Sequence, residues 1–202
     1  MSETESYQEH KRNKYFTRIL EEKLALIILA PIVAVIITTF IFHFYRVDGH
    51  SMEKTFQDND LLLVEKVGKT TSTILRKNYL PQRYDIIVFT QPNYDPNIEL
   101  VKRVIGLPGD RVVVKNKEIK VYNRENPEGI NIDENLPGEA SEIEFVSRFE
   151  KSDVNIKDGE VFVLGDNRPG SDDSRFFGPV ETNNIVGKVI VRIMPFDNFL
   201  IL

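Results

Sequence analysis

Leu100-Val101-Lys102-Arg103-Val104-Ile105-Gly106-Leu107-Pro108-Gly109-Asp110 is a strand-like segment followed by a tight turn. Alternate side chains of an extended chain share one face, so Lys102 lies between Leu100 and Val104. Burial between these apolar neighbours would disfavour the ammonium and lower the pKa of Lys102. The same residues fit equally well a second interpretation, in which Lys102 lies on an edge strand and extends its ammonium into water. The segment therefore indicates a β fold, and it leaves open whether Lys102 is a buried base or an exposed lysine on an edge strand.

Six further segments have the length and the apolar, β-branched composition of strands. Turn signals separate them, and their spacing is too short for repeated βαβ units. We therefore expect a mainly β fold, with an antiparallel, partly closed sheet. A hairpin is expected around Asn116-Lys117, and a loop over residues 68–78. The six predicted strands are Leu61–Val67, Asp85–Phe89, Arg111–Lys115, Glu118–Tyr122, Glu160–Leu164 and Ile185–Ile193.

Residues 123–157 interrupt this pattern with a different composition. The stretch Asn123–Glu144 holds seven acidic residues and one basic residue, together with two prolines and two glycines. Such a segment favours an exposed insertion, and its charge is typical of a solvated face. We expect an inserted cap or flap outside the main sheet.

The N-terminal region contains an uncharged run of 22 residues, 24–45. As a helix this run would span roughly 33 Å, at ~1.5 Å per residue, against a hydrocarbon core of about 30 Å. It is too long for a cleaved secretory signal, and its end is too bulky for a cleavage site. We expect a transmembrane helix over residues 24–45, a tail over residues 1–23 that the basic residues place in the cytoplasm, and an extracytoplasmic domain over residues 46–202.

Composition excludes several classes of function. The 202 residues include no cysteine, which removes thiol nucleophiles, cysteine zinc sites and disulfides. Residues 47–202 hold 20 basic and 26 acidic residues, so the domain has no electrostatic footprint for nucleic acid. The acidic residues of Gly165–Arg175 do not have the spacing of a calcium-binding EF-hand. We expect no metal site and no cofactor.

Gly49-His50-Ser51-Met52 contains a candidate nucleophile, Ser51, which lies six residues after the end of the apolar run. A nucleophilic serine needs a base. In an extended chain His50 points to the opposite face, and the other two histidines lie in the tail and the apolar run. Two lysines remain as bases. Lys54 completes an S-x-x-K pattern without the S-D-N and K-T-G companions of penicillin-binding enzymes and has polar neighbours, so Lys102 is the better candidate.

Three motifs in this order resemble those of type I signal peptidases. Ser51-Met52 resembles the nucleophile motif, Lys102–Asp110 is similar to the lysine motif nearly residue for residue, and Gly165–Arg175 matches G-D-N-R-x-x-S-x-D-S-R at every fixed position. Asp85–Phe89 resembles a fourth, shorter motif. With the apolar run, the resemblance covers about residues 20–195 and looks like the single-anchor Gram-positive form of the family.

The resemblance implies a membrane-bound serine endopeptidase of the plasma membrane that cleaves signal peptides from exported preproteins with a Ser/Lys dyad. It implies Ser51 as nucleophile, with its N–H as an oxyanion donor, and Lys102 as general base. It also implies that Ser171 orients the lysine and that Asp173 and Arg175 form a supporting ion pair. Signal peptides, the lipid bilayer and the translocation machinery are the expected partners.

Three residues depart from the family pattern. Gly49 stands where some members have a hydroxyl that stabilises the oxyanion, so a second donor must be backbone or water. Lys54 replaces a proline, and Tyr84 replaces the glycine before Asp85.

Two other function classes remain open to the sequence. One is a non-proteolytic, peptidase-like assembly factor for surface proteins or fibres, against which the retention of both Ser51 and Lys102 argues. The other is a self-cleaving Ser/Lys regulator, which would need a DNA-binding or regulatory segment where residues 1–45 provide an anchor.

Overall fold

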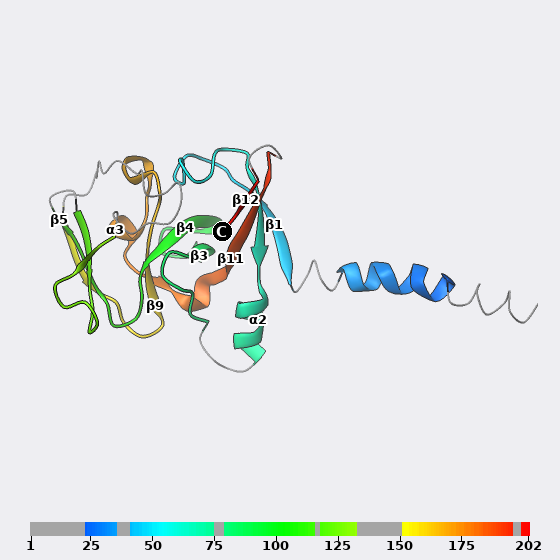
Figure 1. Cartoon of the computed structure of the whole chain (residues 1–202), viewed down its shortest axis with the longest axis horizontal. Helices are drawn as coiled ribbons and strands as arrows, with labels where there is room; N and C mark the ends of the chain where they lie inside the picture. The colour runs from blue at the N-terminus through cyan, green and yellow to red at the C-terminus, as the bar shows by residue number, and fades with distance from the viewer. Residues whose placement is uncertain (1–22, 36–40, 75–78, 116–117, 133–150, 196–198) are drawn as a thin grey trace, which may run out of the picture. The chain divides into compact units, whose positions relative to one another are not determined.

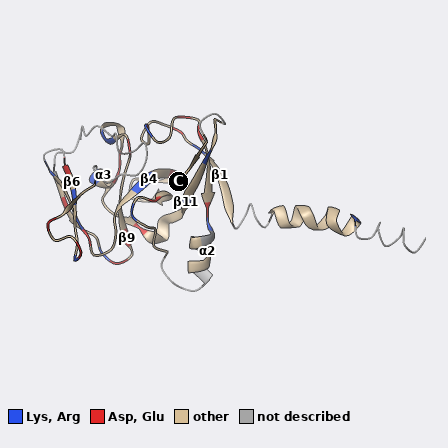
Figure 2. Cartoon of the chain, in the orientation of Figure 1, with Lys and Arg blue, Asp and Glu red and all other residues tan. Residues whose placement is uncertain are grey.

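The computed structural model describes residues 23–35, 41–74, 79–115, 118–132, 151–195 and 199–202. The chain divides into two compact units, Met1–Ile41 and Phe42–Leu202. In the first unit residues 23–35 are helical, and the helix carries no charged side chain after Lys23 (Figure 2). Its exposed large apolar side chains are Leu24, Leu26, Ile27, Ile28, Leu29, Ile32, Val33 and Val35. None of the helices in the described ranges combines the length and apolar character that crossing a membrane requires.

The helix predicted over residues 24–45 does not continue to residue 45. Phe42–Arg46 instead forms strand β1, which pairs antiparallel with β2 (Leu61–Glu65) from Phe42↔Glu65 to Arg46↔Leu61. Aromatic residues favour strands, and β2 offers this segment a full row of backbone partners. An uncharged run by itself does not distinguish a helix from a strand, so the predicted boundary was wrong. Residues 36–40 lie outside the described residues.

The second unit is built on two antiparallel sheets (Figure 1). The larger sheet has the order β1-β2-β11-β3-β4-β9-β10, and β12 pairs with β11. All of its pairs are antiparallel. The remaining strands are β3 (Ile86–Gln91), β4 (Asp95–Gly106), β9 (Glu160–Leu164), β10 (Val180–Glu181), β11 (Ile185–Met194) and β12 (Leu200–Ile201). The mainly β, antiparallel prediction is confirmed.

The smaller sheet has the order β7-β6-β5-β8 and lies beside the larger one, near the label β5 in Figure 1. The predicted hairpin is present, with β5 and β6 paired from Arg111↔Tyr122 to Lys115↔Glu118. The smaller sheet consists of β5 (Arg111–Lys115), β6 (Glu118–Tyr122), β7 (Ile130–Asn131) and β8 (Lys151–Asn155).

Parts of residues 123–157 belong to this smaller sheet rather than to an exposed cap. β7 pairs with β6, and β8 pairs with β5. Ile132 and Ile156 are 0% and 4% exposed and pack in one cluster with Ile105 of β4 and Phe162 of β9. A few isolated β-branched residues in a polar stretch are enough to complete the sheet and its core. Residues 133–150 lie outside the described residues.

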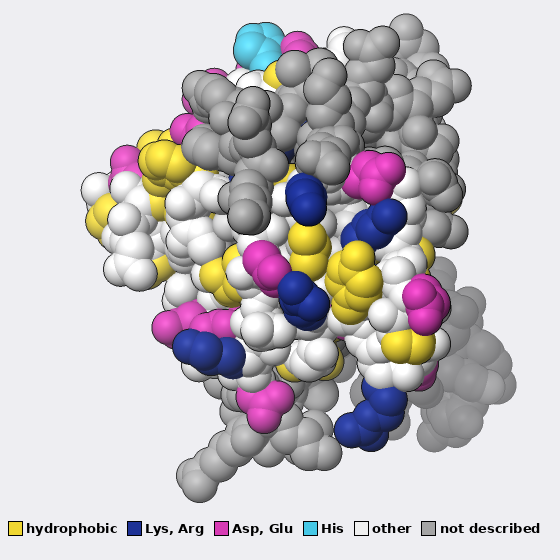
Figure 3. Space-filling model, turned by 90° about the vertical axis from the view of Figure 1, so that its left-hand side faces the viewer, with side chains coloured by type: hydrophobic (Ala, Val, Ile, Leu, Met, Phe, Trp, Pro, Cys, Tyr) yellow, Lys and Arg dark blue, Asp and Glu magenta, His cyan; other side chains and the backbone are white. Residues whose placement is uncertain are grey.

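Short helices connect the strands. α2 (Val67–Ile74) occupies part of the predicted loop over residues 68–78, of which residues 75–78 are not described. η3 (Arg168–Gly170), α3 (Ser174–Phe177) and η4 (Thr182–Asn184) fall between β9 and β11. On the face seen in Figure 3, basic and acidic side chains are interspersed with apolar ones rather than gathered by sign.

Candidate active site

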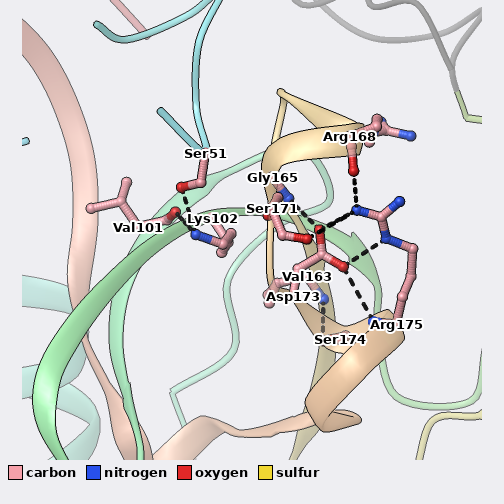
Figure 4. Close-up of polar contacts among 10 residues, drawn as sticks. All are labelled: Ser51, Val101, Lys102, Val163, Gly165, Arg168, Ser171, Asp173, Ser174 and Arg175. Carbon is pink, nitrogen blue, oxygen red and sulfur yellow. Dashed lines mark hydrogen bonds and ion pairs between the residues drawn. The ribbon is translucent and has the colours of Figure 1, made fainter. Parts of the chain in front are cut away.

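Ser51 and Lys102 meet although they come from separate parts of the larger sheet. Ser51 lies in the loop between β1 and β2, and Lys102 lies on β4. The Nζ atom of Lys102 is 2.7 Å from the Oγ atom of Ser51 and donates to the carbonyl of Val101 at 3.0 Å (Figure 4). This is the distance needed for direct proton transfer between a nucleophile and a base.

The amine of Lys102 is almost completely removed from water. The residue is 2% exposed, and burial lowers the pKa of Lys102 from its ordinary 10.5 to about 8 because desolvation disfavours the ammonium. The charges of Asp173, Asp172 and Asp166 oppose this effect and raise the pKa. Desolvation is the larger influence, so an appreciable fraction of Lys102 is neutral near pH 8.

The burial of Lys102 follows from the position of β4 in the sheet. β4 pairs with β3 on one side, including Ile87↔Lys102, and with β9 on the other side from Arg103 onward. The segment is therefore not an edge strand. Of the two interpretations that the sequence allows, the buried lysine is the correct one.

The loop that carries Ser51 is held by apolar side chains and contains a turn that requires glycine. Met52 and Phe56 are 1% and 0% exposed and pack in one core cluster with residues of β2 and β3. Gly49 has φ +105°, a conformation that favours glycine. Its N–H donates to Oδ1 of Asp58 at 2.9 Å. Gly49 thus shapes the turn, while its own N–H is used inside the loop.

Ser171 is buried close to Ser51 and Lys102 (Figure 4), without the hydrogen bond to the lysine that the resemblance implies. It is 1% exposed, and within the described part of the chain its Oγ has no hydrogen-bond partner. Gly165 makes room for this serine: a Cβ atom on Gly165 would lie 2.1 Å from Oγ of Ser171 and 2.5 Å from the carbonyl oxygen of Ser51. Glycine at this position therefore lets the two segments approach each other.

The expected ion pair between Asp173 and Arg175 is present, and both side chains are 0% exposed. Two parallel bonds of 2.8 Å join Nε and Nη2 of the arginine to Oδ1 and Oδ2 of the aspartate (Figure 4). Asp173 also accepts from the N–H of Gly165 at 3.0 Å, and Arg175 donates to the carbonyl of Arg168 at 2.7 Å. The pair therefore fixes the course of the chain from Gly165 to Arg175.

Sequence reasoning missed a second buried ion pair beneath the site. Nη2 of Arg103 lies 2.6 Å from Oδ2 of Asp166, and Nε lies 2.9 Å from Oδ1. The hydroxyl of Thr55 donates to the same carboxylate at 2.6 Å. Because Arg103 follows Lys102 on β4, its side chain lies on the opposite face of the strand. A search of the sequence for an acidic partner of Arg103 could have suggested this ion pair.

The contacts of Asn167 were also missed, although this residue bonds directly to the loop that carries Ser51. Its N–H donates to the carbonyl of Ser51 at 3.1 Å. Its Nδ2 atom donates to the carbonyl of His50 and to Oε2 of Glu53, each at 2.9 Å. This asparagine is a fixed position of the matched Gly165–Arg175 motif, but its residue type alone is equally typical of a turn.

The competing residues near Ser51 lie in other environments. Lys54 is exposed and has φ +82°. The side chain of His50 is 68% exposed and lies 2.7 Å from Glu53. Tyr84, which replaces a family glycine, has φ +74°. In the described ranges, no three His, Cys, Asp or Glu side chains group into a potential metal site.

Comparison with known proteins identifies relatives over most of the chain. A family model described as "Signal peptidase, peptidase S26" matches residues 20–194. The signal peptidase I of Bacillus caldolyticus is 36% identical over 178 residues, which cover 85% of this chain and 90% of that protein. Signal peptidase IB of Staphylococcus aureus strain Mu50 is 33% identical and covers 89% and 92%. A crystal structure of signal peptidase I from Enterococcus faecalis V583 has a TM-score of 0.40 and 30% identity, and the match covers 54% of this chain and 95% of that chain.

Proposed function

The chain belongs to the signal peptidase family, peptidase S26, and is a serine endopeptidase of the signal peptidase I type; we propose that it cleaves the signal peptides of exported preproteins with Ser51 as nucleophile and Lys102 as general base. The observation that carries the assignment of the two residues is the 2.7 Å distance between Nζ and Oγ. It is supported by the low pKa of about 8 that burial gives the lysine. Lys54 is exposed and lacks the desolvation that a lysine base needs.

In the first step, Oγ of Ser51 attacks the carbonyl carbon of the scissile peptide bond while neutral Lys102 takes the hydroxyl proton. The carbonyl electrons move to oxygen and form a tetrahedral oxyanion. When this intermediate collapses, the C–N bond breaks and the ammonium of Lys102 gives its proton to the leaving amine. The products are an ester on Ser51 and a free amino terminus on the mature protein.

In the second step, water hydrolyses this ester. Lys102 is neutral again and removes a proton from the attacking water. The new tetrahedral intermediate collapses with release of Oγ, which receives the proton from Lys102. The signal peptide leaves with a free carboxylate, and Ser51 and Lys102 return to their starting states.

The oxyanion of both intermediates needs a donor. We assign this role to the N–H of Ser51, which makes no hydrogen bond to any described residue. One donor of this kind is typically worth ~2.7–4 kcal/mol in the transition state. Because the N–H of Gly49 is bonded to Asp58, a second donor must come from another backbone group or from water.

The surrounding residues have supporting roles in this proposal. The ion pair of Asp173 with Arg175 keeps Gly165 and Ser171 against the dyad. The hydroxyl of Ser171 is buried and has no hydrogen-bond partner among the described residues, so it can accept a hydrogen bond from Lys102 when the lysine turns away from Ser51 during the reaction. Gly49 provides the turn that presents Ser51.

We also propose that the apolar residues from 24 to 41 hold the enzyme in the plasma membrane, with residues 1–23 in the cytoplasm and the domain from Phe42 onward outside. The support is the uncharged sequence and the exposure of apolar side chains on several sides of the helical residues 23–35. Basic residues before the run favour this orientation. Such an anchor would raise the local concentration of membrane-bound preproteins, and it would bring the enzyme close to the translocation machinery.

A cleavage assay with a purified preprotein tests the dyad. Ser51→Ala and Lys102→Met should each abolish cleavage, because one removes the nucleophile and the other the base. Lys54→Ala is the matched control and should keep most activity. Full activity of Lys102→Met would refute the dyad, and loss of activity in Lys54→Ala would move the base to the nearer lysine.

A further inference from the structure

The direction of the Ser51 N–H depends on the carbonyl of His50. These two groups belong to one peptide unit, which is planar and trans, so they point in opposite directions. Any group that holds the carbonyl oxygen of His50 therefore also aims the N–H of Ser51. Two donors hold this oxygen: Nδ2 of Asn167 at 2.9 Å and the N–H of Glu53 at 3.2 Å.

Asn167 also holds the next peptide unit. Its N–H donates to the carbonyl oxygen of Ser51 at 3.1 Å. One residue thus binds both peptide units that flank the Cα atom of Ser51. The approach is possible because Gly165 has no side chain: a Cβ atom there would lie 2.5 Å from the Ser51 oxygen.

The amide of Asn167 is itself fixed by side chains of the nucleophile loop. An amide nitrogen has two hydrogens to donate, and Nδ2 of Asn167 has two acceptors, the His50 carbonyl and Oε2 of Glu53 at 2.9 Å. The other oxygen of Glu53 lies 2.7 Å from Nδ1 of His50. The carboxylate of Glu53 thus contacts both the His50 side chain and the Asn167 amide.

The turn needs such support from outside because parts of it are strained. Lys54 has φ +82°, a left-handed conformation that costs a non-glycine residue roughly 1–2 kcal/mol. Strained residues of this kind persist only when neighbouring groups hold them in place. A less constrained loop could rotate the His50–Ser51 peptide and turn the Ser51 N–H away from the substrate.

We propose that Asn167 is a positioning residue that locks the His50–Ser51 peptide and so aims the Ser51 N–H at the developing oxyanion, with Glu53 holding the Asn167 amide in place. This inference rests on the proposed function, in which that N–H is an oxyanion donor. The donor acts on charge that exists only in the transition state. Loss of its alignment should therefore lower kcat and leave KM unchanged.

The decisive variant is Asn167→Asp. It keeps the size of the side chain and the backbone N–H, but it replaces the two donated hydrogens with a carboxylate that faces the His50 carbonyl and Glu53. We expect kcat for a preprotein to fall by about 10- to 100-fold, which is less than the ~10²–10³-fold loss seen when an oxyanion donor is removed outright. Because a new carboxylate raises the pKa of Lys102 as the nearby aspartates do, kcat is compared on the high-pH plateau, where Lys102 is neutral in both proteins.

Two further variants provide the controls. Asn126→Asp makes the same substitution in a turn of the smaller sheet, where Nδ2 donates to Oδ1 of Asn123 at 3.2 Å, and it should leave kcat unchanged. Glu53→Gln keeps an oxygen that can accept from Asn167 and should retain most of kcat, whereas Glu53→Ala should lose more. Full-length proteins are compared, with the folded fraction measured by circular dichroism.

An unchanged kcat in folded Asn167→Asp would overturn the proposal, as would a raised KM at constant kcat. A loss of kcat that only follows the unfolded fraction would also overturn it, because the residue would then be structural. These failures are separable from failure of the dyad. If Ser51→Ala is inactive while Asn167→Asp is fully active, only the positioning role is lost; if Ser51→Ala cleaves, the proposed function is lost.

Discussion

Replacing Lys102 with methionine should change the way that stability depends on pH, besides abolishing cleavage. Burial gives Lys102 a pKa of about 8 in the folded protein, whereas a lysine in the unfolded chain has a pKa of about 10.4. The unfolded chain thus binds this proton more tightly, and folding is penalised wherever the ammonium must be buried or deprotonated. The penalty is complete below about pH 8, decreases as the pH rises, and disappears above the unfolded pKa.

The size of the penalty follows from the interval between the two pKa values. At about 1.4 kcal/mol for each pH unit, the interval corresponds to roughly 3 kcal/mol. Methionine removes this penalty but also removes the two hydrogen bonds of Nζ, to Ser51 and to Val101, each worth about 0.5–1.5 kcal/mol. At pH 7 the variant should therefore be as stable as the parent or more stable, and near pH 11 it should be less stable.

Urea unfolding of the full chain in detergent micelles, at several values between pH 7 and pH 11, measures this difference. The matched control is Lys157→Met, because Lys157 is exposed and its ammonium stays in water before and after unfolding. The stability difference between parent and Lys102→Met should change by roughly 3 kcal/mol across the range, while that of the control stays constant. A constant difference for Lys102→Met would refute the claim that burial makes this lysine a base.

Three further predictions concern activity and the conformation of the loops. The kcat for preprotein cleavage should rise with pH and level off above about 8, because neutral Lys102 is the active form; a flat profile between pH 6 and pH 10 would contradict this. Gly165→Ala should lose most activity and about 1–3 kcal/mol of stability, since its Cβ would lie 2.1 Å from Oγ of Ser171 and 2.5 Å from the carbonyl oxygen of Ser51. Unaltered kinetics and an unaltered melting temperature would argue against the close approach of Gly165 to these two residues. Lys54→Gly should raise the free energy of unfolding by roughly 1 kcal/mol through relief of the left-handed strain, and Lys54→Pro should lower it because proline holds φ near −65°. A higher melting temperature for Lys54→Pro than for Lys54→Gly would show that the loop has another conformation.

The strands of the main sheet could be predicted because their apolar, β-branched residues reflect burial directly. The β5–β6 hairpin and the long strand β11 are found close to their predicted bounds. Other elements carry no such signal. β7, β10 and β12 have two residues each, too few for any period to appear. β1 belongs to an uncharged run, in which composition alone does not separate a membrane helix from a strand that completes a sheet.

The chemistry of the site could be predicted only in part. Alternation along residues 100–105 identifies the face on which Lys102 lies, but its burial depends on β3 and β9, which are distant in the sequence. The pairing of Arg103 with Asp166 depends on the same long-range contacts. Asn167 belongs to the matched Gly165–Arg175 motif, but the role inferred for it depends on backbone carbonyl groups of the Ser51 loop, which leave no signal in the sequence.

The distance along the chain between Ser51 and Lys102, 51 residues, has a consequence for the time at which this enzyme becomes active. Proteins are made from the N-terminus, so Ser51 is synthesised long before β9, which pairs with the strand that carries Lys102. In an unfolded chain the amine of Lys102 is in water and is an ammonium near neutral pH, because its pKa is lowered only by burial. Under the proposed mechanism, an incomplete or unfolded chain carries Ser51 without a neutral lysine to take its proton, so catalytic competence would appear only with completion of the tertiary structure.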